Sequence, residues 1–289
     1  MEVLQPSSWG EALAAKKEHP EAVPLAGGTD LLVELNFDRS RPATILDLTR
    51  IPELGQWSHH DGGVRLGAGV TYTRVIAELS TELPGLAIAS RTVGSPQIRN
   101  RGTVGGNLGS SSPAGDALPP LMAIRADVEL ATASGSRVVP VDEFFTGPKR
   151  NVLAPNELIA AIHVPVASGP QQFSKIGTRN AMVIAVASFA LSLDPANHSV
   201  GTGIGSAGPV PLRATEGERF LEGVLEEKKL WESRSQLPET AVTRFAQLAS
   251  EAARPIDDVR GSAAYRRHAL GVMARRTLSW TWDEYRGVT

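Results

Sequence analysis

Two glycine pairs, far apart in the chain, occur in similar surroundings. The first lies in Leu25-Ala26-Gly27-Gly28-Thr29-Asp30-Leu31 and the second in Thr103-Val104-Gly105-Gly106-Asn107-Leu108. Glycine adopts positive φ without steric cost, so consecutive backbone N–H groups can point one way and form a concave anion site. Two such sites facing each other would hold a diphosphate, with hydroxyl donors from Thr29 and Thr103. The alternative for each pair alone is an ordinary tight turn.

Charged side chains lie close to the second glycine pair. The loop that follows it ends in Asp116, and acidic residues bind ribose hydroxyls in other nucleotide sites. The alternative is that Asp116 caps a helix that begins near Leu118. The arginines Arg91, Arg99 and Arg101 flank the pair, either as a solvated basic edge or as a contact with a phosphate or another subunit.

No other motif predicts chemistry. Gly203-Ile204-Gly205-Ser206-Ala207-Gly208 fits the G-x-G-x-x-G pattern of dinucleotide-binding folds. That pattern works where a strand leads into a helix, but here Pro209-Val210-Pro211 follows at once, so we expect a strand end and a loop. The six histidines form no cluster with metal-ligand spacing, and no H-E-x-x-H or G-x-S-x-G string occurs. Neither a metal site nor a catalytic residue is therefore predicted.

The composition excludes several classes of protein. Cysteine is absent from the 289 residues, which excludes disulfides, thiolate zinc, cysteine nucleophiles and iron–sulfur clusters held by this chain. A net charge of −2 without a basic run disfavours nucleic-acid binding. No apolar run reaches the ~20 residues of a membrane span, and the N-terminus lacks the basic start and apolar core of a signal peptide. We therefore expect a soluble cytoplasmic protein.

The first part of the chain alternates helices and strands. We expect a first unit of helix, strand, helix and strand over 10–17, 22–26, 31–35 and 44–48, with Ser7 or Ser8 as the first cap. A second unit has a strand over 63–69, helices over 71–79 and from 85, and strands over 127–132, 137–141 and 157–164. The pair His59-His60 is expected in an exposed turn. The glycine- and proline-rich stretch 93–120 is expected to be a loop wrapped around something.

The pattern changes after Ala167-Ser168-Gly169-Pro170, the best candidate for a linker. Strands are expected over 173–176, 181–193 and 200–206, followed by helices around 213–228, 238–252 and 261–278. Strands followed by helices indicate an α+β domain. We therefore divide the chain into residues 1–170, in two parts over 1–55 and 56–170, and residues 171–289.

These segments resemble a known family. Leu25 to Leu31, Pro96 to Leu108 and Ser112 to Asp116 are similar to the FAD-binding medium subunit of molybdenum hydroxylases, which include xanthine dehydrogenase and carbon monoxide dehydrogenase. Residues 157–165, 173–179 and 265–276 resemble further parts of that subunit, so the resemblance covers essentially the whole chain. It implies an α+β fold, with a two-part FAD-binding domain of the vanillyl-alcohol-oxidase (PCMH) type over 1–170. A C-terminal domain with a three-stranded antiparallel sheet and helices follows.

The resemblance also implies which residues bind FAD. The glycine segments hold its diphosphate, Asp116 contacts FAD, and Leu158 and Ile159 offer backbone contacts near the flavin ring. Lys175 lies close to the ring, where a cation would stabilise reduced flavin. The implied FAD-binding residues are Ala26, Gly27, Gly28, Thr29, Asp30, Leu31, Thr103, Gly105, Gly106, Asn107, Asp116, Leu158, Ile159 and Lys175.

In that family the chemistry divides among subunits. A large subunit with the molybdenum cofactor oxidises the substrate, a small subunit carries iron–sulfur (2Fe-2S) clusters, and the flavin subunit passes their electrons to NAD⁺, O₂ or a quinone. The implied assembly is a dimer of heterotrimers, and a chain without cysteine agrees with this division. The first motif ends Gly-Gly-Thr-Asp instead of the Gly-Gly-His-Ser typical of the carbon monoxide branch, so we expect an N-heterocycle, purine or aldehyde as substrate. The alternatives are a stand-alone FAD oxidoreductase of the same superfamily and a scaffold that has lost FAD.

Overall fold

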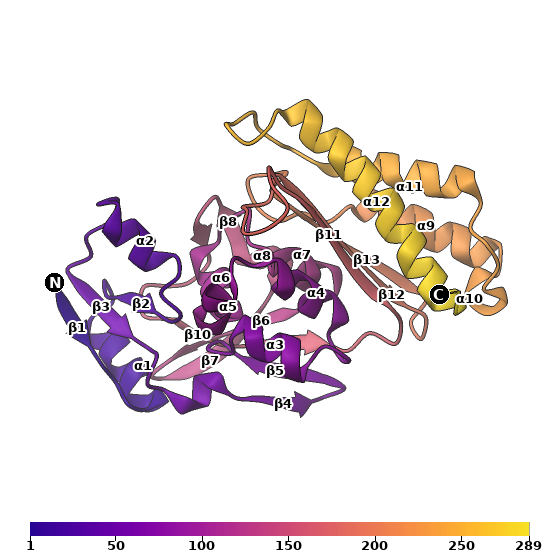
Figure 1. Cartoon of the computed structure of the whole chain (residues 1–289). Coiled ribbons are helices and arrows are strands. Elements are labelled where there is room, and N and C mark those ends of the chain that lie inside the picture. Colours follow the sequence, from indigo (N-terminus) through magenta and orange to yellow (C-terminus); the bar gives the residue numbers. More distant parts are fainter. Residues whose placement is uncertain (289) are drawn as a thin grey trace.

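The chain begins with a small parallel sheet (Figure 1). In the computed structural model, which describes residues 1–288, β1 (Glu2–Leu4) and β2 (Val23–Leu25) pair with β3 (Thr44–Asp47) on either side. Helix α1 (Trp9–Glu18) begins after Ser8, whose hydroxyl accepts a hydrogen bond from the Glu11 N–H, and α2 (Leu31–Asn36) precedes β3. The sequence prediction lacked β1, because a strand of three residues is too short to show an alternating pattern.

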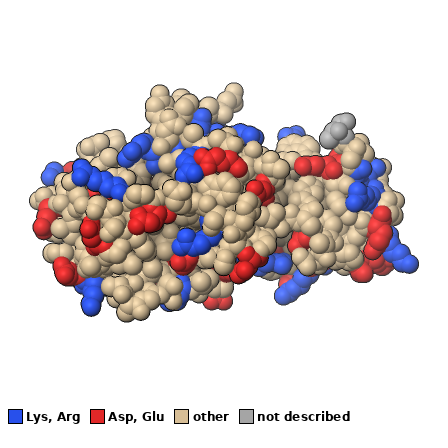
Figure 2. Space-filling model, turned by 90° about the horizontal axis from the view of Figure 1, so that it is seen from below, with Lys and Arg blue, Asp and Glu red and all other residues tan. Residues whose placement is uncertain are grey.

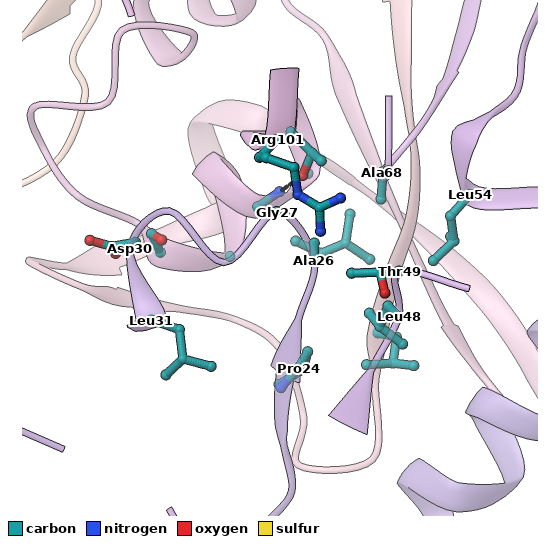
Figure 3. A pocket seen from close by; sticks show the side chains of 18 of the residues that line it. Pro24, Ala26, Gly27, Asp30, Leu31, Leu48, Thr49, Leu54, Ala68 and Arg101 are labelled. Atoms are coloured by element: carbon teal, nitrogen blue, oxygen red, sulfur yellow. Dashed lines mark hydrogen bonds between the residues drawn. The ribbon is translucent and has the colours of Figure 1, made fainter. Parts of the chain in front are cut away.

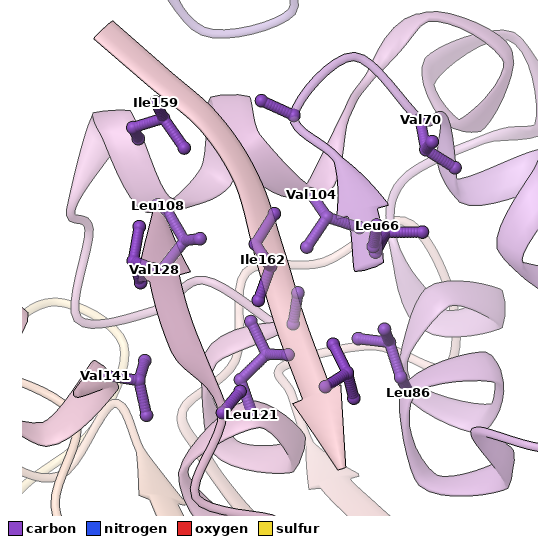
Figure 4. Close-up of a cluster of buried hydrophobic side chains, with 14 of the residues drawn as sticks. Leu66, Val70, Leu86, Val104, Leu108, Leu121, Val128, Val141, Ile159 and Ile162 are labelled. Carbon is purple, nitrogen blue, oxygen red and sulfur yellow. The ribbon is translucent and has the colours of Figure 1, made fainter. Parts of the chain in front are cut away.

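A five-stranded antiparallel sheet follows, in the order β4-β5-β10-β6-β7. Its strands are β4 (Trp57–His60), β5 (Gly63–Gly67), β6 (Asp127–Thr132), β7 (Gly135–Pro140) and β10 (Leu158–Pro165). The central strand β10 is mostly buried, and Figure 4 shows Ile159 and Ile162 of this strand among the surrounding apolar side chains. The prediction of a turn at His59-His60 was wrong, since both residues lie on the edge strand β4, whose outward-facing polar side chains hide its pairing.

Short helices connect β5 to β6. The helices expected over 71–79 and from 85 are present, and three more lie within or overlap 93–120, where a loop was expected. Together they are α3 (Tyr72–Glu78), α4 (Pro84–Thr92), α5 (Pro96–Arg101), α6 (Val104–Ser110) and α7 (Leu118–Ala123). The hydroxyls of Ser95 and Thr103 cap α5 and α6 by accepting hydrogen bonds from backbone N–H groups. Helices of six or seven residues that contain glycine or proline are too short to show helical periodicity, so the prediction failed there.

A helix α8 (Val141–Phe144) and a two-stranded sheet of β8 (Phe145–Gly147) and β9 (Arg150–Asn151) lie between β7 and β10. The elements after β10 form an α+β unit, as expected. Strands β11 (Gln171–Ile176), β12 (Ala187–Asp194) and β13 (Ser199–Gly205) form the three-stranded antiparallel sheet. Figure 1 shows the C-terminal helices on one side of this sheet, and α7 contacts β12 and β13. These helices are α9 (Thr215–Glu227), α10 (Leu230–Ser233), α11 (Glu239–Ala252) and α12 (Ala263–Arg286). The expected strand over 181–193 begins only at Ala187, since residues before it form a loop in which Met182 has a φ of +49°.

The G-x-G-x-x-G string has a packing role. Gly203 lies in β13, and a Cβ there would stand 2.6 Å from the carbonyl carbon of Pro119. Glycine thus lets β13 pack against the backbone of α7, and no helix begins directly after the string. Within residues 1–288, no helix is both long and apolar enough to cross a membrane. Figure 2 shows acidic and basic side chains interspersed on one face, in agreement with the small net charge.

Candidate cofactor-binding site

A cleft with two lobes lies beside the carboxyl ends of the parallel strands β2 and β3. The first lobe has a volume of about 500 Å³ and the second of about 380 Å³. Leu158 and Ile159 of β10 line the first lobe only, and the β11–β12 loop lines the second only. Both lobes share one wall, whose predicted site residues are Ala26, Gly27, Asp30, Leu31, Thr103 and Gly106.

The two glycine segments meet at this shared wall. A Cβ on Gly27 would lie 2.6 Å from the carbonyl carbon of Arg101 and 2.9 Å from the Cα of Gly102, and a Cβ on Gly106 would lie 4.0 Å from that of Ala26. Only glycine at position 27 allows the two backbones to come so close. Segments distant in the sequence therefore line the same cavity, as a shared diphosphate site requires.

The first glycine segment presents free backbone donors. Gly28 has a φ of +74°, which favours glycine, and α2 begins directly after Asp30. The N–H groups of residues 27–31 donate no hydrogen bond to any residue within 1–288. All five residues line the second lobe. Consecutive unpaired N–H groups at a cavity wall form a site for an anion.

The second glycine segment is built differently from the prediction. Neither Gly105 nor Gly106 has positive φ, because both lie in the first turn of α6. Their N–H groups are occupied, since Gly105 donates to Ala68 O at 3.1 Å and Gly106 to Thr103 Oγ1 at 2.8 Å. The prediction of a free row of donors here was wrong. Gly105 instead allows close packing, because a Cβ there would stand 2.5 Å from that of Ala68, and the Thr103 hydroxyl proton remains free to donate to a ligand.

A buried ion pair lies at the second lobe. Lys175 Nζ is 2.6 Å from Asp116 Oδ2 and also donates to Thr92 O at 3.2 Å, and both side chains of the pair are less than a tenth exposed. Asp116 Oδ1 is buried without a hydrogen-bond partner in the described chain. Burial raises the pKa of Asp116 to about 6, although the charge of Lys175 acts to lower it. The alternative that Asp116 caps α7 was wrong, since Ala117 is the N-cap of α7 and no side chain caps this helix with a hydrogen bond.

Asn107 holds the loop that carries Asp116. Its Oδ1 accepts a hydrogen bond from the Ala117 N–H at 3.3 Å, and its side chain packs so close to Gly115 that a Cβ there would lie 2.5 Å from Nδ2. Asn107 also lines the second lobe. The structure thus gives this predicted binding residue a positioning contact that the sequence did not reveal.

The residues predicted to lie near the flavin ring are divided between the two lobes. Leu158 and Ile159 line the first lobe, whereas Asp116 lines the second and holds Lys175. Sequence reasoning missed Leu48 and Thr49, which Figure 3 shows in the first lobe near Ala26. Both follow β3, and the rule that ligands bind at the carboxyl ends of parallel strands would have found them.

The residues present fit FAD. The shared wall offers free N–H groups to a diphosphate, and the orphaned Asp116 Oδ1 can accept a hydrogen bond from a ligand hydroxyl. Apolar side chains in the first lobe and an ion pair beside the second suit two chemically different ends of one ligand. In residues 1–288, no group of three or more His, Cys, Asp or Glu residues is placed to hold a metal ion.

Comparisons with known proteins identify the family. Residues 1–167 match the model of the FAD binding domain in molybdopterin dehydrogenase, and residues 172–281 match the CO dehydrogenase flavoprotein C-terminal domain. The glyceraldehyde dehydrogenase medium chain of Sulfolobus acidocaldarius is 31% identical over 280 residues, covering 95% of this chain and 96% of that one. The xanthine dehydrogenase FAD-binding subunit of Escherichia coli O157:H7 is 30% identical over 282 residues, with 93% and 91% covered.

A solved structure shows the same fold. A chain of carbon monoxide dehydrogenase from Hydrogenophaga pseudoflava matches with a TM-score of 0.87 and 30% identity, and the match covers 98% of each chain. The fold thus occurs in a protein whose sequence resembles this one along its whole length. The chain is an oxidoreductase subunit and belongs to the family of FAD-binding medium subunits of molybdenum hydroxylases.

Proposed function

We propose that this chain binds one FAD across the two lobes and acts as an electron-transfer subunit. It receives electrons from the iron–sulfur clusters of a partner subunit and passes them to a terminal acceptor. The observation that carries the proposal is the row of unpaired N–H groups over residues 27–31, at the wall where the lobes meet. A diphosphate in the middle of an extended dinucleotide would bind there.

Each end of FAD is assigned to one lobe. The first lobe would hold the adenine, because Leu48, Leu54 and Ile159 give it apolar walls suited to a planar base. The second lobe would hold the flavin, with Lys175 as the nearby cation and Asp116 Oδ1 as acceptor for a hydroxyl of the chain that joins ring and phosphate. Leu158 and Ile159 then contact the adenine end, which revises the expectation that they lie near the ring.

The residues of this chain bind and tune the cofactor. When bound, FAD accepts and releases the electrons. The N–H groups of residues 27–31 and the Thr103 hydroxyl would hold its phosphates, and Gly105, Gly106 and Asn107 keep the second segment in place. Lys175 is held by Asp116 and Thr92, and its positive charge favours the reduced, anionic flavin.

Partner subunits supply the remaining chemistry. A chain without cysteine holds no iron–sulfur cluster, so a small subunit would carry the clusters and a large one the molybdenum cofactor, in a dimer of heterotrimers. We propose an FAD-binding domain over residues 1–170 and a C-terminal flavoprotein domain over 171–289, which adds Lys175 and the β11–β12 loop to the flavin end of the site. The Gly-Gly-Thr-Asp motif supports an N-heterocycle, purine or aldehyde as substrate of the large subunit, and the relatives named above for glyceraldehyde and xanthine belong to these classes.

Reconstitution with FAD tests the proposal. The purified full chain, stripped of flavin and incubated with FAD, should regain flavin absorbance at one FAD per chain. The bound flavin should be reduced by the substrate only when the cysteine-rich and molybdenum subunits are added. Reduction of the chain alone by substrate would favour the stand-alone oxidoreductase, and failure to bind FAD would leave only a scaffold.

A further inference from the structure

Arg101 is the cation that lines the cleft without a carboxylate partner. The other cation that lines the first lobe, Lys149, pairs with Glu34, and no Lys or Arg lines the second lobe. Lys175 beside the second lobe pairs with Asp116. The Arg101 guanidinium makes no ion pair or hydrogen bond with the described residues of the chain.

The position of Arg101 in the fold aims it at the shared wall. Arg101 ends α5, directly before Gly102 and the helix cap Thr103, and its carbonyl group lies against Gly27. Figure 3 shows its guanidinium over Ala26, on the side of the cleft where Ala68 and Thr49 lie. The side chain therefore reaches from the second glycine segment across the first one, into the first lobe.

The neighbouring arginines have different surroundings. Arg99, on the same helix, donates to the carbonyl oxygens of Val93 and Gly94, both at 3.1 Å, and thereby holds the turn before α5. Arg91 is exposed at the end of α4 and lines neither lobe. The basic cluster of the sequence thus divides into one structural residue, one solvated residue and one residue at the cleft.

We propose that Arg101 binds the phosphate on the adenosine side of the FAD diphosphate, and so makes the site select FAD over FMN. This inference rests on the proposed function. The unpaired backbone N–H groups of the shared wall are neutral, and Asp30 adds a negative charge to that wall. The wall itself therefore does not neutralise the negative charge of the diphosphate. A guanidinium forms short, charge-assisted hydrogen bonds with phosphate oxygens, often in pairs. FMN lacks the adenosine-side phosphate and would gain nothing from Arg101.

Flavin titrations of the full-length apoprotein test this assignment. We expect Arg101→Ala to weaken FAD binding by about tenfold or more, equivalent to about 1.4 kcal/mol, and to leave FMN binding within about twofold of the native value. The FAD affinity of Arg101→Lys should lie between those of the native chain and Arg101→Ala, because a lysine keeps the charge but not the paired donors. Arg91→Ala is the matched control and should change neither affinity. The side chain of Arg101 has no partner to lose, so thermal unfolding of the apoprotein should be unchanged.

The outcomes separate the inference from the function on which it rests. If the native chain binds no FAD, the proposed function fails. If the native chain binds FAD and Arg101→Ala binds it equally well, only the role of Arg101 is wrong. A variant that loses FAD and FMN to the same degree would likewise overturn the selection of FAD, because the arginine would then act on any phosphate at the wall.

Discussion

The close approach of the two glycine segments makes Gly27→Ala a sharp perturbation. The new Cβ would lie 2.6 Å from the carbonyl carbon of Arg101 and 2.9 Å from the Cα of Gly102. Carbon atoms normally pack at about 3.5–4.0 Å. Both neighbours are backbone atoms, so no side chain can turn aside and the segments must separate by roughly the missing ångström. Overpacking of this kind costs about 1–3 kcal/mol of unfolding free energy.

The same displacement should weaken FAD binding. The N–H groups of residues 27–31 would move away from the Thr103 side of the cleft. Loss of one hydrogen bond to a charged group costs about 1.5–3 kcal/mol, which corresponds to roughly a tenfold to hundredfold loss in affinity. We therefore expect Gly27→Ala to unfold at lower urea concentration than the native apoprotein and to bind FAD at least about tenfold more weakly, as measured by flavin fluorescence titration.

A glycine with open space around it provides the matched control. Gly223 lies inside α9, and a Cβ there would meet no atom within 4 Å. Gly223→Ala should therefore stabilise the chain by about 0.5–1 kcal/mol, because alanine loses less conformational entropy in a helix, and should leave FAD affinity unchanged. If Gly27→Ala matched this control in both stability and affinity, the convergence of the two segments at a ligand site would be refuted.

Three further perturbations address the buried charges. Lys175→Met should lower the midpoint potential of the bound flavin, and an unchanged potential in a redox titration would place the lysine away from the ring. Burial raises the pKa of Asp116 to about 6, against 3.8 for the ordinary carboxyl. Between these pH values the folded apoprotein holds a proton that the unfolded chain has released. The contribution of Asp116 to the free energy of unfolding should therefore fall by up to about 3 kcal/mol as the pH rises from 4 to 6. The measure is the difference from Asp116→Asn in urea titrations, because other carboxyls contribute to the pH dependence of both chains. The same pH dependence in the native chain and the variant would contradict the burial argument. Arg266→Met should destabilise the C-terminal unit by about 3 kcal/mol in urea unfolding. The reason is that the Arg266 guanidinium donates to Val186 O and Ser206 O and pairs with Asp258. A change below about 1 kcal/mol would show that these bonds contribute little.

Much of the architecture follows from local sequence signals. Periodicity and turn residues located most helices and strands, and the order of strands followed by helices predicted the α+β arrangement of the C-terminal elements. The failures lie where the signals are short. β1 has three residues, and α5 and α6 have six and seven, so none of them shows a periodic pattern. The local signals for the two helices are the caps Ser95 and Thr103, with Pro96 at the first position of α5.

Most of the predicted site residues line the cleft, but their geometry could not be read from the sequence. The glycine pairs are equivalent as strings, yet only the first leaves its N–H groups free, because Ala68 and Thr103 accept hydrogen bonds from the second. Those acceptors become neighbours through tertiary packing, which the sequence pattern does not encode. The pairing of Asp116 with Lys175, and the free guanidinium of Arg101, depend in the same way on elements brought together by the fold.

A crystal structure of this chain with FAD would test the central assignment most directly. We expect the diphosphate to accept hydrogen bonds from N–H groups of residues 27–31 and from the Thr103 hydroxyl, with the flavin ring on the side of Lys175 and the adenine beside Ile159. A diphosphate bound elsewhere, or a dinucleotide lying in a single lobe, would contradict it.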